Sequence, residues 1–343
     1  MPALAVAGAL RAKGAEAEFI GGERAETELV PAAGYPLHRL AVAGIDRRNP
    51  LRAARALLLA ARAAGEARRL LRVLEPDAVL GGGGYVSGPV GLAARSLGLP
   101  LGLCEADSHL GVANRMLAPF AARVFLSFPV AERAGAKYLV TGRPVPPETG
   151  RVDRRAARAR LGIAADRPCL LVFGGSLGAR RLNWAALEAF GADAPCSVLH
   201  AAGRRDYEEL RGRLRALGDR PHYHLHAYIE PFAEALAASD LAVARAGGSV
   251  LELAAAGVPA VLVPYPHATA DHQTTNARYM EAAGAAVVVA DRALDGPRLA
   301  REVAALLRTP TRLAAMARAA RAASRPDAAE RIADETLALA ARR

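Results

Sequence analysis

The chain has 343 residues, 52% of them hydrophobic, and a formal net charge of +11 at pH 7. This length suits two domains, and the sequence has no apolar run near the ~20 residues that a membrane-spanning helix needs. Three scattered cysteines argue against a disulfide scaffold or a zinc site, and the few aromatic residues argue against a surface for single-stranded nucleic acid.

The N-terminal segment has the pattern of a helix followed by a strand. Residues 3–11 predict the helix, and residues 17–20 predict a strand that ends at Gly21 and Gly22. A doubly wound α/β domain begins instead with a strand and a phosphate-binding turn. We therefore interpret the chain as starting inside a β–α–β unit.

The segment from residue 51 to residue 74 predicts a long basic amphipathic helix, in which arginines surround a stripe of leucine and alanine. Such a helix either covers a sheet with its arginines in water or lies on an anionic membrane, and the sequence leaves both interpretations open. The positive net charge suits an anionic partner: a diphosphate substrate, an acidic membrane face or nucleic acid.

A run of four glycines follows the strand that is predicted at residues 77–80. Glycines let the backbone approach a ligand closely, and the helix predicted through Ser96 directs its N-terminus at the same place. The next strand, residues 99–104, runs into a cluster of acidic and imidazole groups at residues 105–109. Parallel α/β sheets place their ligands at such strand ends, so both segments are candidate binding elements.

The second half of the chain repeats this strand–turn–helix pattern. Residues 141–147 are rich in proline and are the best candidate for an interdomain linker. After the linker, residues 169–173 predict a strand and residues 174–180 a glycine turn that leads into a helix near residue 182. Other strands are predicted at 124–126, 138–140, 198–200 and 226–229, and other helices at 234–238, 297–307, 313–322 and 327–343.

The most informative stretch lies between residues 241 and 276. It predicts a strand, a Gly-Gly-Ser turn, a helix that begins at Val250, and a second strand at residues 258–263. The turn offers backbone N–H groups to a phosphate, and Glu252 is placed to accept hydrogen bonds from ribose hydroxyls. An ordinary strand–turn–helix with a surface glutamate would look similar. The polar cluster at residues 271–276 favours a nucleotide-sugar site.

Four motifs together resemble the MurG family of N-acetylglucosaminyltransferases. They are Gly-Gly-Tyr-Val-Ser-Gly-Pro at 83–89, Gly-Gly-Ser-Leu-Gly-Ala at 174–179, Arg-Ala-Gly-Gly-Ser at 245–249 and Pro-His…Asp-His-Gln at 266–273. The resemblance implies an α/β protein of the GT-B fold, with two Rossmann-like doubly wound domains and an interdomain cleft. It implies an acceptor- and membrane-facing N-terminal domain at 1–143 and a UDP-GlcNAc-binding domain at 144–326. It also implies a C-terminal helix at 327–343 that crosses back to the N-terminal domain.

The resemblance also implies a reaction. GlcNAc passes from UDP-GlcNAc to the C4 hydroxyl of MurNAc on lipid I, the undecaprenyl-diphosphate-linked MurNAc-pentapeptide, and gives lipid II for peptidoglycan synthesis. The transfer is inverting and needs no metal or other cofactor, and the sequence has no Asp-x-Asp pair to hold a metal. The enzyme is expected to be peripheral, at the cytoplasmic face of the cell membrane, with an anionic membrane surface and no nucleic acid among its partners.

The resemblance assigns site residues in both halves. On the donor side, the backbone of Ile229 holds uracil, Glu252 the ribose hydroxyls, and Gln273 and Asn276 the hydroxyls of GlcNAc. The donor diphosphate is expected at Ser176 and at the backbone amides of Gly247, Gly248, Ser249 and Val250. The acceptor is expected at Gly82, Gly83, Gly84, Tyr85, Ser87, Asp107 and Asn114.

Three departures from the family pattern affect these expectations. Pro146 stands where members carry an arginine directly after Pro-Val, and Arg143 is the nearby arginine that would replace it. Asp107 stands where members carry asparagine. The chain is also expected to lack the family's first strand and its Gly-Gly-x-Gly-Gly-His turn, since Pro2 aligns just after that turn.

The histidine of that turn is a proposed general base, so the catalytic residue stays unassigned, with Glu105, Asp107 and His109 as stand-ins. A positioned base contributes about 10²–10⁴-fold. We therefore expect the chain as given to bind UDP-GlcNAc but to transfer it slowly. Two alternatives stay open: a related GT-B transferase with another acceptor, and an inactive UDP-sugar-binding remnant. A dinucleotide-dependent oxidoreductase is disfavoured, because no Gly-x-Gly-x-x-Gly follows a strand with an acidic residue ~20 residues later.

Overall fold

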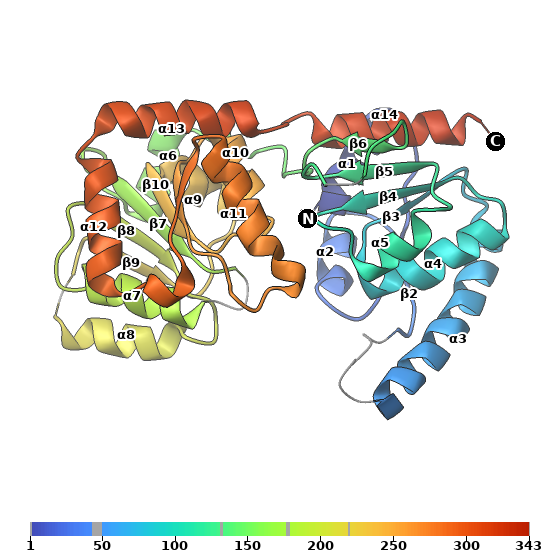
Figure 1. The fold of residues 1–343 in the computed structure, drawn as a ribbon, viewed down its shortest axis with the longest axis horizontal. Coiled ribbons are helices and arrows are strands. Elements are labelled where there is room, and N and C mark those ends of the chain that lie inside the picture. Colours follow the sequence, from blue (N-terminus) through green and yellow to red (C-terminus); the bar gives the residue numbers. More distant parts are fainter. Residues whose placement is uncertain (1, 43–49, 131–132, 176–178, 219, 343) are drawn as a thin grey trace. The chain divides into compact units, whose positions relative to one another are not determined.

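The computed structural model describes residues 2–42, 50–130, 133–175, 179–218 and 220–342 of the chain (Figure 1). The chain forms two compact units. The first consists of Met1–Pro144 together with Pro326–Arg343, and the second of Val145–Arg325. Both units are α/β structures in which all strand pairs are parallel, as the alternation of apolar strands and helices predicted.

The first unit contains two parallel sheets. One has two strands, β1 (Phe19–Gly21) and β2 (Leu37–Arg39), and the other has four strands in the order β3-β4-β5-β6. These four strands are β3 (Val79–Gly81), β4 (Leu101–Glu105), β5 (Arg123–Leu126) and β6 (Tyr138–Val140). The helices are α1 (Pro2–Ala12), α2 (Glu26–Ala32), α3 (Pro50–Leu74), α4 (Gly84–Ser96), α5 (Val112–Leu117) and the C-terminal α14 (Ala328–Ala340).

Helices, not strand pairing, connect the two sheets of the first unit. Helix α1 packs Val6 against Phe125 and Leu80 of the four-stranded sheet, and it packs Ala7 in a cluster that includes Phe19 of β1. On the opposite face, Ile20 of β1 and Val79 of β3 contact the same core under α3 and α4. Burial of these apolar faces therefore holds β1 and β2 beside the larger sheet.

The second unit has one six-stranded sheet in the order β12-β11-β10-β7-β8-β9. Its strands are β7 (Cys169–Phe173), β8 (Ser197–Ala201), β9 (Tyr223–His226), β10 (Leu241–Ala244), β11 (Ala260–Leu262) and β12 (Ala286–Val288). Its helices are α6 (Arg154–Leu161), α7 (Arg180–Phe190), α8 (Tyr207–Ala216), α9 (Phe232–Ala238), α10 (Val250–Ala256), α11 (His272–Ala282), α12 (Gly296–Leu307) and α13 (Pro310–Ala323). The central strands β7 and β10 are fully buried, as expected for parallel strands that helices cover on both faces.

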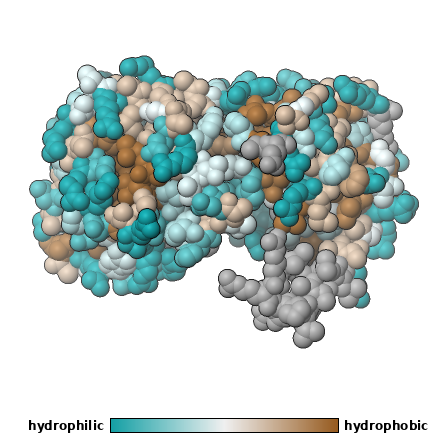
Figure 2. Space-filling model, viewed as in Figure 1, coloured by the Kyte–Doolittle hydropathy of each residue, from teal (hydrophilic) through white to brown (hydrophobic). Residues whose placement is uncertain are grey.

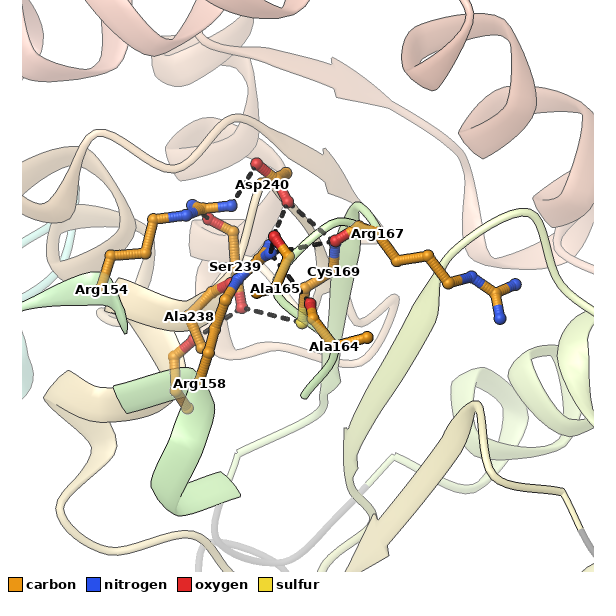
Figure 3. A network of polar contacts seen from close by, with 10 residues as sticks. Arg154, Arg158, Ala164, Ala165, Arg167, Cys169, Ala238, Ser239 and Asp240 are labelled. Carbon is orange, nitrogen blue, oxygen red and sulfur yellow. Dashed lines mark hydrogen bonds and ion pairs between the residues drawn. The ribbon is translucent and has the colours of Figure 1, made fainter. Parts of the chain in front are cut away.

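A buried arginine holds together the end of this sheet at which the strands β7 and β10 begin (Figure 3). Arg158 of α6 is 5% exposed and donates hydrogen bonds to the carbonyl oxygens of Ala164, Ala165, Arg167 and Ala238. It also contacts the Asp240 carboxylate at 2.8 Å, and that carboxylate accepts a hydrogen bond from the Cys169 amide. The network joins α6 to the first residues of two central strands. It lies at the amino ends of the strands, away from the carboxyl ends where such sheets bind ligands.

Most predicted elements are present, and several have the predicted bounds, including β6, β7, β10 and α10. The strand predicted at residues 226–229 is wrong. The structure has β9 at Tyr223–His226 instead, because Tyr223 and Leu225 face the core and pair this segment with β8. The sequence interpretation did not identify α2, α5, α6, α8, α11, β2 or β12.

The coloured part of the face in Figure 2 mixes hydrophilic residues with smaller hydrophobic patches. Helix α3 has the predicted extent, but the side chains of Arg52 and Arg55 lie outside what the structure describes. Within the described ranges, no helix is both long and apolar enough to cross a membrane.

Candidate active site

The predicted phosphate turn of the second unit lies at the carboxyl end of β10. Gly247 and Gly248 form the turn, and Ser249 is the N-cap of α10 without a side-chain capping bond. The amide of Val250 donates to the carbonyl of Gly247 at 3.1 Å, so the turn itself uses this predicted phosphate donor. Within the described part of the chain, the amides of Gly247, Gly248 and Ser249 donate no hydrogen bond. These three N–H groups are the donors that an anion would meet at this helix end.

Arg245 holds this turn in place, a role that the sequence interpretation missed. Its side chain is buried and lies 2.6 Å from the carboxylate of Asp291. It also donates to the carbonyl oxygens of Val263 and Pro264, at 3.1 and 3.3 Å. The arginine thereby ties the end of β10 to the end of β11 and to the short helix at Asp291–Ala293. The signal in the sequence is an arginine placed directly after a fully apolar strand.

Glu252 lies in the first turn of α10 and is half-buried, and its predicted contact with ribose stays a prediction. Two other predicted donor-side residues lie on α11. Gln273 accepts a hydrogen bond from the Tyr265 amide at 2.9 Å. Asn276 is 0% exposed, and its Nδ2 donates to the carbonyl of Ala246 at 3.1 Å. Asn276 thus holds the backbone next to the turn and Gln273 the backbone after β11, and their predicted contacts with GlcNAc stay predictions.

Two predicted donor residues follow other strands of the same sheet, Ile229 the edge strand β9 and Ser176 the strand β7 beside β10. Ile229 is buried just after β9. Ser176 lies outside the described residues, so its predicted contact with phosphate stays a prediction. Gly174 precedes it directly after β7, and a Cβ atom there would lie 2.3 Å from the Cβ of Ala179. The chain therefore needs glycine where it turns from β7 towards α7.

In the first unit, the glycine turn after β3 leads into α4. Gly83 is the N-cap with a φ of +82°, and Gly84 has a φ of +75°, a region that side chains rarely adopt. The Ser87 hydroxyl donates to the carbonyl of Gly83 at 2.7 Å and is buried. Ser87 therefore stabilises the turn, and no side chain that the structure describes caps the N-terminus of α4. Tyr85 packs against Gly22, with the guanidinium of Arg24 over its ring, and its predicted contact with the acceptor stays a prediction.

The polar loop after β4 is folded around Glu105. This buried carboxylate accepts hydrogen bonds from the amides of Gly111 and Asp107, at 2.8 and 3.3 Å, and from Nδ2 of Asn114 at 2.9 Å. Asn114 is itself buried and also donates to the carbonyl of Cys104 at 2.9 Å. Glu105 and Asn114 thus form the frame of the loop that carries Asp107 and His109.

Two other features limit the chemistry of this end of the first unit. Burial raises the pKa of the Cys104 thiol to about 12, which keeps the thiol protonated near neutral pH and unsuited to act as a nucleophile. Among the residues that the structure describes, no three His, Cys, Asp or Glu side chains are arranged to hold a metal ion.

Comparisons with known proteins agree with this arrangement over nearly the whole chain. Residues 1–126 match the glycosyltransferase family 28 N-terminal domain, and residues 169–332 match the glycosyltransferase family 28 C-terminal domain. A relative from Moorella thermoacetica is 44% identical over 96% of this chain and 93% of its own length. A relative from Stutzerimonas stutzeri is 41% identical over 99% of this chain and 95% of its own length. Both are named UDP-N-acetylglucosamine–N-acetylmuramyl-(pentapeptide) pyrophosphoryl-undecaprenol N-acetylglucosamine transferase.

Solved structures with a similar fold also match nearly the whole chain. The crystal structure of Acinetobacter baumannii MurG has a TM-score of 0.78 and 31% identity, and the match covers 98% of this chain and 95% of that one. A UDP-GlcNAc 2-epimerase from Neisseria meningitidis, bound to UDP-GlcNAc, has a TM-score of 0.69 at 16% identity over 98% of this chain and 95% of that one, a likeness of fold alone. These comparisons confirm the predicted GT-B class with its two Rossmann-like units.

Proposed function

The chain belongs to glycosyltransferase family 28 and to its MurG group, and from this membership we propose that it transfers GlcNAc from UDP-GlcNAc to lipid I and forms lipid II. The observation that carries the proposal is 44% identity to a named transferase over nearly the full length of both chains. The reaction class is that of a hexosyltransferase that acts in peptidoglycan synthesis. The acceptor is an undecaprenyl-pyrophosphoryl MurNAc-pentapeptide.

The reaction forms one bond and breaks one bond at the anomeric carbon of GlcNAc. The C4 hydroxyl oxygen of MurNAc attacks this carbon, the bond to the β-phosphate oxygen of UDP breaks, and the configuration inverts. The hydroxyl proton passes to a base, for which no described residue is assigned. Negative charge builds on the departing diphosphate, and donors already aimed at that charge lower the barrier.

The second unit offers these donors in the free amides of Gly247, Gly248 and Ser249. The dipole of α10 adds to their effect, although the helix is short. Arg245 and Asn276 keep the turn rigid, so the donors need little rearrangement as the charge develops. In this assignment, Glu252 accepts the ribose hydroxyl groups, and Gln273 contacts the sugar.

We also propose that the first unit binds an anionic membrane, where the lipid-linked acceptor resides. Four large apolar side chains are exposed on or next to α4 and α5: Leu92, Val112, Met116 and Phe120. Met116 is 62% exposed, and the guanidinium of Arg95 lies 3.2 Å from the centre of the Phe120 ring. Apolar side chains beside arginines are typical of a surface that enters the headgroup layer of a bilayer.

Sedimentation with vesicles rich in anionic lipid tests the membrane proposal. We expect the chain to bind and to be released as salt rises, because salt screens the attraction between arginines and lipid headgroups. Met116→Gln should weaken binding, whereas Leu217→Gln, which changes an exposed leucine of the second unit, should not. Binding that does not depend on salt, or no binding, would contradict the proposal.

The transferase function is tested with labelled UDP-GlcNAc and a lipid I analogue. The proposal predicts a labelled lipid II product. Binding of UDP-GlcNAc without any transfer would instead favour the UDP-sugar-binding remnant, and transfer to a different lipid-linked sugar would favour the related transferase.

A further inference from the structure

Three of the eight histidines of the chain alternate along one short segment of the second unit. His222 directly precedes β9, and His224 and His226 belong to the strand. Among the described strands, β9 pairs with β8 alone and so forms one edge of the six-stranded sheet. Side chains two residues apart in a strand point to the same face, about 6.6 Å apart along the chain. Tyr223 and Leu225 pack into the core, so His224 and His226 share the opposite face.

The imidazoles of His224 and His226 have no hydrogen-bond partner inside the protein. Both side chains are half-buried, and within the described part of the chain neither makes a hydrogen bond or an ion pair. Neither ring has a nitrogen that is buried without a partner, so the nitrogens of both rings reach solvent. His222 differs from them, because its Nε2 donates to the carbonyl oxygen of Phe190 at 2.9 Å. Two accessible imidazoles therefore follow one another on the outer face of β9.

The electrostatic environment of His224 shows that these rings are close to each other. Burial lowers the pKa of His224, and the neighbouring imidazoles of His226 and His222 lower it further. Nearby charges shift a pKa in this way only over a short range. The His224 ring also lies beside Gly162, the residue at which α6 ends.

We infer that His224 and His226 together bind one divalent transition-metal ion, of the class that prefers nitrogen ligands and includes Zn²⁺. Imidazole nitrogen suits zinc, copper and nickel, whereas magnesium and calcium prefer oxygen ligands. Rings that start from neighbouring positions on one face can turn their nitrogens towards a single ion. Since no three His, Cys, Asp or Glu side chains of the described residues form a metal site, water completes the coordination of this ion.

Other groups that commonly bind zinc are not available in this chain. Burial raises the pKa of Cys104 and Cys196 to about 12 and that of Cys169 to about 11, so these thiols stay protonated near neutral pH. His200 is fully buried, and its two ring nitrogens contact the Tyr223 hydroxyl and the side-chain oxygen of Asn183. Zinc added to the folded chain should therefore act on accessible imidazoles.

Calorimetry with the full chain tests the inference. Zinc chloride is titrated into the unaltered chain, His224→Asn and His226→Asn, and magnesium chloride is titrated into the unaltered chain. The control is His267→Asn, which removes an exposed imidazole from another part of the same unit. Thermal unfolding in the presence of a chelator checks that each variant is folded, and the corresponding glutamine variant replaces any asparagine variant that is not.

We expect one zinc ion per chain and no binding of magnesium at the same concentration. Each β9 variant should weaken zinc binding about tenfold or more, because the loss of a group that only supports a metal ligand already costs 10–100-fold. His267→Asn should change the affinity little. Zinc should also raise the midpoint of thermal unfolding of the unaltered chain, and it should raise that of the His224→Asn, His226→Asn double variant less.

Three results would overturn the inference. They are the absence of zinc binding to the unaltered chain, unchanged zinc affinity in either β9 variant, and equal losses of affinity in His224→Asn and His267→Asn.

Discussion

Replacing Arg158 with methionine should destabilise the second unit strongly. Methionine keeps an apolar stem but removes the five hydrogen bonds that Arg158 donates to four carbonyl oxygens and to Asp240. Removing one partner of a buried ion pair costs about 3–5 kcal/mol. Asp240 is 27% exposed and keeps its hydrogen bonds from Arg154 and Cys169, so the loss of Arg158 leaves its charge partly compensated and lowers the loss of stability that arises from Asp240. The carbonyl oxygens left without donors add to it, so we expect a total of about 3–5 kcal/mol.

The assay uses the single tryptophan of the chain, Trp184, which lies on α7 and so reports on the second unit. Its fluorescence is followed during unfolding in urea. With a slope of about 2 kcal/mol per molar urea, the midpoint should fall by about 2 M. Arg154→Met is the control. Arg154 also contacts Asp240 but is 44% exposed, so its loss should cost about 0–1 kcal/mol. Equal midpoints for the two variants would refute the reasoning.

Three further predictions follow from the second unit. Burial lowers the pKa of His200 to about 3, so the unfolded chain takes up a proton near pH 6.5 and the folded chain does not. The free energy of unfolding should therefore fall as the pH is lowered from about 6.5 to 3, by up to about 1.4 kcal/mol per pH unit. In unfolding followed by Trp184 fluorescence, His200→Gln should make the free energy of unfolding depend less steeply on pH. Glu252→Ala should weaken UDP-GlcNAc binding by about 1–3 kcal/mol in calorimetry, whereas Glu209→Ala should not, and unchanged affinity would remove Glu252 from the site. Gln273→Ala should reduce discrimination against UDP-GalNAc and UDP-glucose in competition assays, because a site built for particular hydroxyl groups rejects analogues that leave its groups unpaired; retained selectivity would make Gln273 a purely structural residue.

Local signals explain which parts of the structure could be predicted from the sequence. The segment from β10 to α10 was predicted with its observed bounds, because an apolar run, a Gly-Gly-Ser turn and a left-handed Gly257 each mark a boundary. The glycine turn before α4 was predicted for the same reason. The local sequence did not decide the bounds of β9, and pairing with β8 selects residues 223–226.

Contacts between distant parts of the chain account for what the sequence did not reveal. Arg158 and Asp240 are 82 residues apart, and no local pattern indicates that they meet. The predicted contact of Asn276 with the sugar stays a prediction, and only the fold shows that this residue is buried and donates to the carbonyl of Ala246. The Nε atom of Arg143, which is buried without a hydrogen-bond partner among the described residues, also emerges only when the surrounding loops are in place.

The division of the first unit into two sheets has a consequence for its local opening. In parallel strands, alternate residues direct their N–H groups to opposite edges. Phe19 and Val79 donate to the chain segments beside them, so the amides of Ile20 and Leu80 point to the edges of β1 and β3 that pair with no strand described in the structure. Helix α1 packs against both sheets, so we expect that local opening of this helix exposes both edges to water together. Hydrogen exchange at Ile20 and Leu80 should therefore rise and fall together and report the opening of α1.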